Sequence, residues 1–438
     1  MIAHTFVEQV RSIELVRRAG RVRKILPTFI EADGPDAPLG ALCDIEAKGK
    51  AGSVLAQIVR VGRDGVVLAP FVAGEAIVSG ARVTARSSDD LVPVGDAYLG
   101  RAIDGLGRPI DGGLAIRALT RAPIAGTPTA PLNRVTPTEV LETGLRAVDG
   151  LLTLGKGQRV GVFAPAGVGK TSLMNRLVRD VSADRCVICL VGERGREVEA
   201  LWSKGLPDDV KRRSVLVAAT SDQTASMRVR ASDQALALAE HWRSQGLHVL
   251  LVLDSVTRLA MALRETGLAA GEPPTVRAYT PGVFAAIPRL VERCGAVASG
   301  GAISAVITVL SESVEMDDPI SEMMKSLLDG HLLLSRELAE QGHFPAIDVS
   351  RSISRLALEL GTPEHRALAS RIVALLGAYE ASRTLIEAGV YQRGASPETD
   401  RAIERRPAMT AFLRQAPAER SSLAQTLERL REAAGAAA

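Results

Sequence analysis

Ala164-Pro-Ala-Gly-Val-Gly-Lys-Thr171 is the stretch of sequence that decides the fold. It has the pattern of a phosphate-binding loop, in which Lys170 reaches the β and γ oxygens and the Thr171 hydroxyl can hold Mg²⁺. An apolar run (159–163) precedes it and a stretch with helical spacing (172–179) follows it, which is the setting that the motif needs. The sequence therefore predicts a site for ATP and Mg²⁺. The residues expected to cradle the nucleotide are Ala164, Gly167, Val168, Gly169, Lys170, Thr171 and Ser172.

Ala164 departs from the motif, because it stands where the loop usually has its first glycine. Alanine tolerates most turn conformations except those that need a positive φ. The substitution weakens the bare motif without excluding it. The alternative interpretation is a glycine-rich turn between two core elements.

Two further segments place carboxylates where such a site would need them. The apolar run 248–253 ends at Asp254, and the apolar run 186–191 leads to Glu193. Ligands of parallel sheets bind at the carboxyl ends of the strands, so Asp254 is predicted to serve Mg²⁺ and Glu193 to act as the general base. The alternatives are a helix-capping aspartate and a surface glutamate.

The overall composition favours a folded protein in the cytoplasm. The chain has 438 residues, enough for about three domains, and it carries 53 basic against 50 acidic residues. This balance and an aromatic content of 3% argue against nucleic-acid binding. No apolar run approaches the roughly 20 residues of a membrane span. Cys186 and Cys189 form a C-x-x-C, but residues three apart on a strand face opposite ways, which favours core packing over a metal site.

The pattern along the chain suggests three parts. Residues 1–85 combine a basic, amphipathic arm (1–25) with short strand signals that predict a small β-barrel. Such an arm suits a partner or a membrane surface, and a solvated lead-in helix is the alternative. Residues 86–360 alternate strands with helices, which is typical of an α/β core with a parallel sheet. Residues 361–438 show helical spacing only and predict a helical domain.

Taken together, the motifs resemble the ATPases of type III protein export, which serve flagella and injectisomes and are similar to the catalytic subunits of rotary ATP synthases. The resemblance implies a RecA-like P-loop core between the barrel and the helical domain. The motifs that carry it are residues 105–111, 143–150, 164–171, 192–198, 253–258, 271–275, 328–331 and 345–348. One departure is Ala278-Tyr-Thr-Pro-Gly-Val-Phe284, where the family commonly has Gly-Tyr-Pro-Pro-Ser-Val-Phe.

The resemblance also implies roles and partners. Lys170, Glu193, Arg194 and Arg355 would be catalytic, with Arg194 placing the γ-phosphate and Arg355 acting as an arginine finger in a neighbouring subunit. A structural arginine is the alternative for Arg355. Because the base and the finger occur on one chain, we expect a homohexamer. The partners implied are a stator-like regulator, a central stalk protein, chaperone–cargo complexes and an export gate, at the periphery of the inner membrane. No aromatic near 361–365 suggests itself for stacking on the base.

Two other function classes stay open at this point. A hexameric RNA-translocating ATPase would share the core and a similar loop, and RNA-stimulated hydrolysis would favour it. A ring subunit that only binds nucleotide would not need a base at Glu193. The sequence does not separate a flagellar from an injectisome role.

Overall fold

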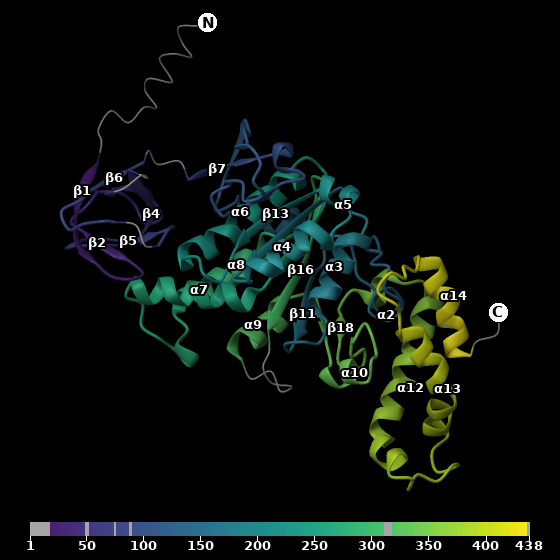
Figure 1. The fold of residues 1–438 in the computed structure, drawn as a ribbon. Coiled ribbons are helices and arrows are strands. Elements are labelled where there is room, and N and C mark those ends of the chain that lie inside the picture. The colour runs from purple at the N-terminus through teal and green to yellow at the C-terminus, as the bar shows by residue number, and fades with distance from the viewer. Residues whose placement is uncertain (1–17, 49–51, 74–75, 87–89, 311–317, 436–438) are drawn as a thin grey trace, which may run out of the picture.

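The structure is a computed structural model that describes residues 18–48, 52–73, 76–86, 90–310 and 318–435. Figure 1 shows three regions in a row, with a barrel at the N-terminal end, a sheet covered by helices in the middle and a group of helices at the C-terminal end. Within these residues, none of the helices combines the length and the apolar composition that a membrane span requires.

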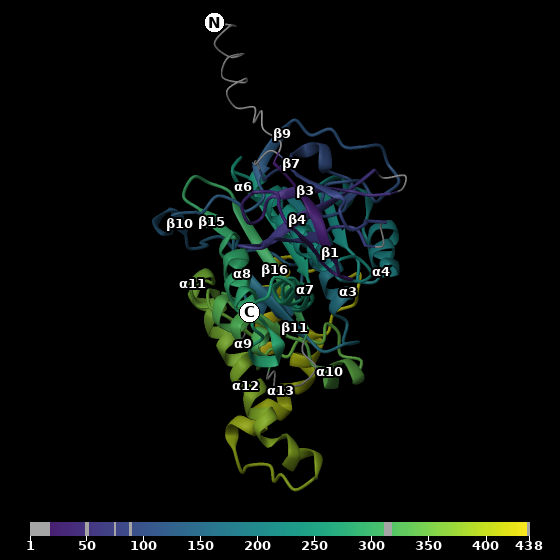
Figure 2. The same ribbon diagram turned by 90° about the vertical axis from the view of Figure 1, so that its left-hand side faces the viewer.

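The N-terminal region is a closed barrel with strand order β1-β2-β5-β4-β3-β6. Seen from the barrel end in Figure 2, β1, β3 and β4 lie in front of the sheet. Alternate side chains of β4 point inward, where Val54, Ala56 and Ile58 are buried, as expected for a barrel wall with one solvated face. The barrel strands are β1 (Ala19–Ile25), β2 (Ile30–Ala32), β3 (Leu42–Glu46), β4 (Ser53–Gly62), β5 (Gly65–Pro70) and β6 (Arg82–Ala85).

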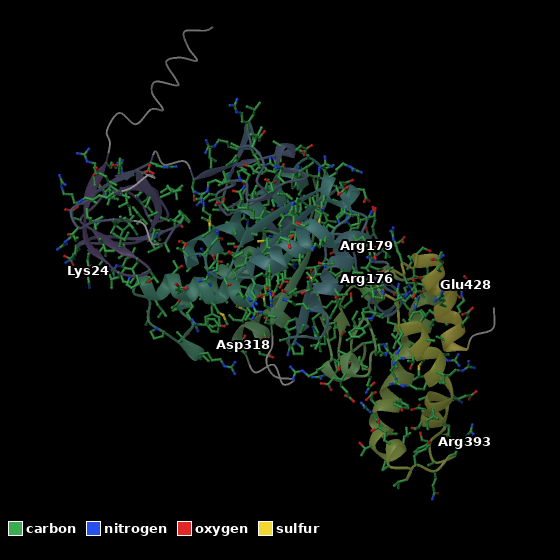
Figure 3. The ribbon with its side chains drawn as sticks, viewed as in Figure 1. Lys24, Arg176, Arg179, Asp318, Arg393 and Glu428 are labelled. Atoms are coloured by element: carbon green, nitrogen blue, oxygen red, sulfur yellow. The ribbon has the colours of Figure 1, made fainter. Side chains whose placement is uncertain are left out.

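The barrel includes residues that the sequence pattern assigns to a basic arm. Arg21, Arg23 and Lys24 lie in β1, and the two arginines donate hydrogen bonds to the carbonyl oxygens of Gly80 and Asp64. The prediction of an arm is therefore wrong for residues 19–25, because pairing with β2 and β6 outweighs the helix-like spacing. Lys24 projects outward from the barrel (Figure 3). Residues 1–17 of the expected arm lie outside the described residues.

The middle region is built on a mostly parallel sheet with the order β18-β17-β11-β16-β14-β12-β13-β8. Its strands are β8 (Ala102–Ile103), β11 (Arg159–Ala164), β12 (Arg185–Val191), β13 (Ser214–Ala219), β14 (His248–Asp254), β16 (Ala302–Leu310), β17 (Gly330–Leu333) and β18 (Ile353–Ser354). Four short strands lie beside it: β7 (Leu91–Val94), β9 (Thr120–Pro123), β10 (Arg134–Val135) and β15 (Gly295–Val297). Strands alternating with helices give this sheet, as the sequence predicts.

Helices cover both faces of the sheet. One face packs against α2 (Arg146–Leu151), α3 (Lys170–Asp180), α4 (Gly195–Ala200) and α5 (Asp208–Arg212), and the other against α6 (Ala225–Arg243), α7 (Val256–Ala269), α8 (Pro281–Glu292) and α9 (Pro319–Leu327). Cys186 lies in the first of these two cores and Cys189 in the second. Both cysteines are buried, so the C-x-x-C is core packing, as predicted.

The C-terminal helices share a core with the sheet region. They are α12 (Pro363–Glu387), α13 (Pro397–Leu413) and α14 (Leu423–Ala434), preceded by the short α10 (Arg336–Glu340) and α11 (Ala357–Leu360). Leu430 is fully buried and Leu427 is half-buried, which confirms the expected packing face. Their apolar residues join the cluster that contains α2 and α3. The helices at this end therefore pack on α2 and belong to the same apolar core as α3, the helix that follows the glycine loop.

Candidate active site

The glycine loop connects β11 to α3 at the carboxyl edge of the sheet. Ala164 is the last residue of β11 and pairs with Leu310, so it is extended and needs no glycine. Gly167 and Gly169 have φ of 83° and 92°, a region that favours glycine. Gly169 precedes the first turn of α3, whose free N–H groups and dipole favour an anion. The missing first glycine therefore does not impair the loop.

Three of the predicted residues converge beside this loop. The Nζ atom of Lys170 lies 2.5 Å from Oδ1 of Asp254 and 3.6 Å from Oε1 of Glu193. The three side chains are only 6–12% exposed. Asp254 ends β14 and Glu193 follows β12, and these strands are neighbours in the sheet. The carboxyl ends of parallel strands thus bring together groups that lie far apart in the sequence.

Glu193 is nearly buried and held in place by a neighbouring arginine. Its Oε2 atom lies 2.7 Å from Nη1 of Arg258, while its buried Oε1 accepts no hydrogen bond from the described residues. Burial raises the pKa of the Glu193 carboxyl, and the nearby charge of Asp254 raises it further, whereas Lys170 and Arg258 lower it. A buried carboxylate oxygen that accepts no hydrogen bond keeps its capacity to accept one.

Arg258 is a site residue whose role the sequence analysis did not assign. It lies on α7, where its guanidinium donates a hydrogen bond to the carbonyl oxygen of Gly192 and forms an ion pair with Glu193. The arginine therefore holds both the turn before Glu193 and the Glu193 carboxylate. The signal in the sequence was its position four residues after Asp254, which places it in the first turn of α7.

The donor set near Lys170 fits magnesium. Thr171 is exposed at the start of α3, and Asp254 offers a carboxylate, so both candidate ligands are hard oxygens. The described residues contain no group of three His, Cys, Asp or Glu side chains that could hold a metal by themselves. Mg²⁺ commonly binds through one carboxylate, waters and substrate phosphates, so this sparse set is appropriate.

The remaining predicted residues lie in different surroundings. Arg194 is exposed and directly precedes α4, next to Glu193. Ser172 is exposed on the first turn of α3, whereas Val168 is 2% exposed and packs into the core beneath the loop. Val168 therefore supports the loop by packing, and its contribution to a ligand would be through its backbone.

Arg355 does not lie near the loop of its own chain. Val160, near the start of β11, pairs with Gly330, and Gly330 pairs with Ser354. Arg355 follows Ser354, is exposed, and donates to the carbonyl oxygen of Lys325. The loop leaves the other end of β11, about 13 Å further along at roughly 3.3 Å per residue. Arg355 therefore lies near the start of β11, at the opposite end of that strand from the loop.

An aromatic ring that the sequence analysis missed lies against the loop. Phe344 is 45% exposed, and its ring is 3.6 Å from the point where a Cβ atom at Gly169 would stand. An exposed phenylalanine beside a phosphate-binding loop offers a face on which a nucleobase can stack. No pattern in the sequence places it there, because the segment around 344 reaches the loop only through the tertiary fold.

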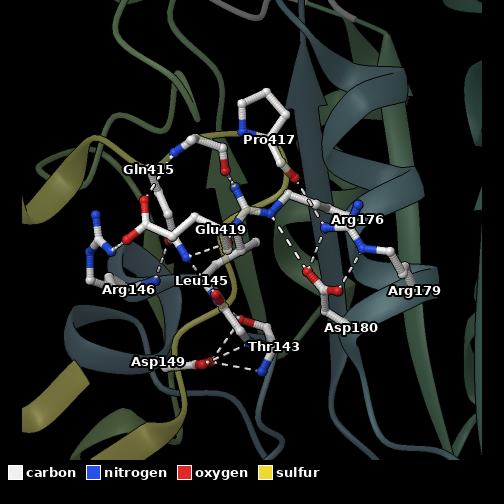
Figure 4. A network of polar contacts seen from close by, with 12 residues as sticks. Thr143, Leu145, Arg146, Asp149, Arg176, Arg179, Asp180, Gln415, Pro417 and Glu419 are labelled. Atoms are coloured by element: carbon white, nitrogen blue, oxygen red, sulfur yellow. Dashed lines mark hydrogen bonds and ion pairs between the residues drawn. The ribbon is translucent and has the colours of Figure 1, made fainter. Parts of the chain in front are cut away.

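The glycine-loop helix is also tied to the C-terminal helices (Figure 4). Arg176 and Arg179 of α3 donate to the carbonyl oxygens of Ala416 and Pro417 at 3.2 and 3.1 Å. The backbone N–H of Gln415 in the same segment donates to the carbonyl oxygen of Phe344 at 2.8 Å. The segment after α13 therefore connects the phosphate loop, the exposed ring and the C-terminal helices.

Comparison with known protein families gives two matches along the chain. Residues 144–354 match the ATP synthase alpha/beta family, nucleotide-binding domain. Residues 361–432 match the T3SS EscN ATPase C-terminal domain. The first match contains the glycine loop, Glu193, Asp254 and Arg258, and the second covers most of α12 to α14.

Full-length relatives agree with these matches. The flagellum-specific ATP synthase of Bacillus subtilis is 41% identical over 99% of both chains. The type 3 secretion system ATPase of Xanthomonas euvesicatoria is 42% identical over 98% of this chain and 97% of its own. The assembled ATPase EscN of the enteropathogenic E. coli type III secretion system superposes with a TM-score of 0.89 at 40% identity, covering 95% of this chain and 100% of that one. With its barrel, its nucleotide-binding core and its C-terminal helices all matched, the chain belongs to the family of flagellar and type III secretion ATPases.

Proposed function

We propose that this chain hydrolyses ATP with Glu193 as the general base and uses the reaction to drive protein export. Membership of the family supports the overall activity. The single observation that supports the chemistry is the buried Oε1 of Glu193, which accepts no hydrogen bond from the described residues and lies 3.6 Å from the lysine of the phosphate loop. A carboxylate placed in this way can take a proton from a water molecule next to the phosphates.

The other residues bind and orient. Lys170 and the N-terminus of α3 neutralise phosphate oxygens, and Arg258 keeps Glu193 directed toward them. Arg194 lies next to the base and places the γ-phosphate. Mg²⁺, when held by Thr171 and Asp254, would neutralise the charge that develops on the phosphate oxygens. Phe344 stacks on the nucleobase of ATP. Stacking adds to the affinity for nucleotide with little selectivity, since every nucleobase has a π-face.

We further propose a homohexamer in which Arg355 completes the neighbouring site. The position of Arg355 at the far end of β11 from the loop supports this arrangement, because its own site lies out of reach. An arginine finger supplied by a neighbour is typically worth about 10³ to 10⁵ in rate. The similarity to the assembled ATPase EscN supports a ring.

The partners follow from the same similarity. EscN was also solved in complex with its central stalk EscO, and that complex superposes on this chain with a TM-score of 0.87. We propose a stalk protein of this kind, a stator-like regulator, chaperone–cargo complexes and an export gate as partners, with the ring on the cytoplasmic side of the inner membrane. In this role ATP hydrolysis would release cargo from its chaperones and unfold it for export.

Steady-state ATP hydrolysis and ATP-analogue binding of Glu193→Gln test the proposal, with Glu199→Gln as the matched control. Glu199 is exposed on α4, six residues from the base. We expect Glu193→Gln to lose at least about a hundredfold in kcat while binding is kept, because general bases typically contribute 10² to 10⁴. Native rates in Glu193→Gln would refute the assigned base. A rate that rises with added RNA would favour the RNA-translocating alternative.

A further inference from the structure

Thr308 lies where the sheet brings the glycine loop and the aspartate of β14 together. It belongs to β16, the strand between β11, which leads into the loop, and β14, which ends at Asp254. Leu253 pairs with Ile307, so Asp254 and Thr308 come next on their two strands. Thr308 is therefore the nearest polar residue that the sheet can offer to the Asp254 carboxylate.

The contact between the two side chains is short and buried. Oγ1 of Thr308 lies 2.6 Å from Oδ1 of Asp254, and Thr308 is 0% exposed. An ionised carboxylate only accepts, so the hydroxyl must donate. Its alternative acceptor, the carbonyl oxygen of Leu253, is 3.4 Å away, which is long for an O–H donor. The hydrogen bond to Asp254 is thus the dominant one.

The two oxygens of Asp254 are used unequally. Oδ1 accepts from Thr308 and contacts Lys170 at 2.5 Å, whereas Oδ2 accepts no hydrogen bond from the part of the chain that the structure describes. With Oδ1 fixed by a rigid, β-branched residue of the neighbouring strand, the carboxylate plane is fixed as well. Oδ2 is then the oxygen left for a metal ion or its water.

We infer that Thr308 is a positioning residue for magnesium binding. It orients the Asp254 carboxylate and keeps Oδ1 occupied when Lys170 turns to the phosphates, so that Oδ2 is presented to the ion. This inference rests on the proposed function, in which Asp254 serves Mg²⁺. Outer partners of metal ligands typically contribute 10- to 100-fold in metal affinity, and Thr308 should lie in this range.

Thr308→Val tests the inference, because valine has nearly the same shape and lacks the donor. Thr308→Ser restores the hydroxyl. Thr280→Val is the matched control, since Thr280 is also 0% exposed and its Oγ1 has no hydrogen-bond partner among the described residues. The readout is equilibrium binding of a fluorescent ATP analogue to the full chain as Mg²⁺ is titrated, with a parallel titration in EDTA. No turnover is needed.

For Thr308→Val we expect the Mg²⁺ concentration that gives half of the increase in binding of the ATP analogue to rise about tenfold or more. In EDTA, the affinity for the analogue should stay within about twofold of the native value. Thr308→Ser and Thr280→Val should match the native protein. An unchanged Mg²⁺ requirement in Thr308→Val overturns the inference, and so does an equal loss of affinity with and without Mg²⁺, which would indicate a merely structural role. A native chain that binds no nucleotide, or binds it without regard to Mg²⁺ or to Asp254→Ala, overturns the proposed function instead.

Discussion

Lys170 forms a nearly buried ion pair with Asp254, with Nζ and Oδ1 2.5 Å apart. The phosphate-binding lysine is therefore held by the carboxylate that we assign to magnesium. Glu193 and Arg258 complete the group, in which two acids and two cations balance one another. Breaking such a buried pair on one side is costly, because it leaves a charge without compensation.

Replacing Lys170 by alanine should destabilise the chain in a pH-dependent way. Asp254 would lose its ion pair, and Glu193 would keep only its contact with Arg258. The charge of Lys170 lowers the pKa of the Glu193 carboxyl, so that pKa would rise in the variant. We expect the free energy of unfolding to fall by about 3 kcal/mol at pH 7.5. A carboxyl whose pKa is higher in the folded than in the unfolded chain makes folding more favourable at low pH, where it is protonated. The loss of unfolding free energy should therefore be smaller at pH 5.5. Urea unfolding at the two pH values measures it. Lys156→Ala, which removes an exposed ion pair with Glu139, is the control; equal losses in both variants would contradict the expectation.

The pH dependence of hydrolysis should report the environment of Glu193. Burial raises the pKa of its carboxyl, so the acid limb of kcat/KM should have its midpoint above about 4.3, the ordinary value for glutamate. The charge of Arg258 lowers that pKa, and Arg258→Ala should therefore move the midpoint further up. Arg212→Ala, on the exposed side of α5, should leave the midpoint in place. Identical midpoints in Arg258→Ala and the native protein would show that the two side chains are not coupled.

Truncating Phe344 should weaken nucleotide binding without affecting magnesium. Stacking on an aromatic ring is worth about 1 to 3 kcal/mol per base, so Phe344→Ala should bind ATP at least about fivefold more weakly. Phe344→Trp should keep the affinity, and GTP and ATP should be affected alike. Leu132→Ala removes another exposed apolar side chain, 95% accessible, and should change nothing. Calorimetric titration decides between stacking and an unrelated surface role, which would leave Phe344→Ala at native affinity.

The loop before α8 contains a strained alanine. Ala278 has a φ of 59°, in the left-handed region that favours glycine. A non-glycine residue in this conformation costs about 1 kcal/mol or more. Ala278→Gly should therefore raise the free energy of unfolding by up to about 1 kcal/mol, after the entropy gained by the unfolded chain is subtracted. Ala424→Gly, on the exposed face of α14, should lower it by about the same amount. A loss in both variants would mean that Ala278 is not strained.

The sequence was informative wherever function depends on the ends of strands. The runs before Ala164, Glu193 and Asp254 each end at the carboxyl edge of one sheet, so local pattern and a general rule of parallel sheets suffice to bring them together. The barrel and the C-terminal helices were equally predictable, because their strands and helices carry the expected apolar periodicity. The missing first glycine was the one local doubt, and the end of a strand at Ala164 removes it.

Other parts of the site depend on tertiary packing that no local pattern encodes. Phe344 reaches the loop from a segment 175 residues away, and Thr308 matters only because β16 lies between β11 and β14. In residues 19–25, by contrast, a local pattern is present but suggests the wrong structure. Val22 is buried in the barrel while its charged neighbours are exposed, so the strand has the basic composition of a free arm.

Mixing two inactive variants tests the shared active site most directly. Glu193→Gln lacks the base and keeps Arg355, whereas Arg355→Ala keeps the base and lacks the finger. If Arg355 serves the neighbouring subunit, each variant alone should be inactive, and a mixture should recover ATP hydrolysis at the interfaces where an intact base meets an intact finger, about a quarter of them at equal amounts. Native activity in Arg355→Ala alone, or a mixture that forms mixed rings by light scattering and stays inactive, would contradict the account.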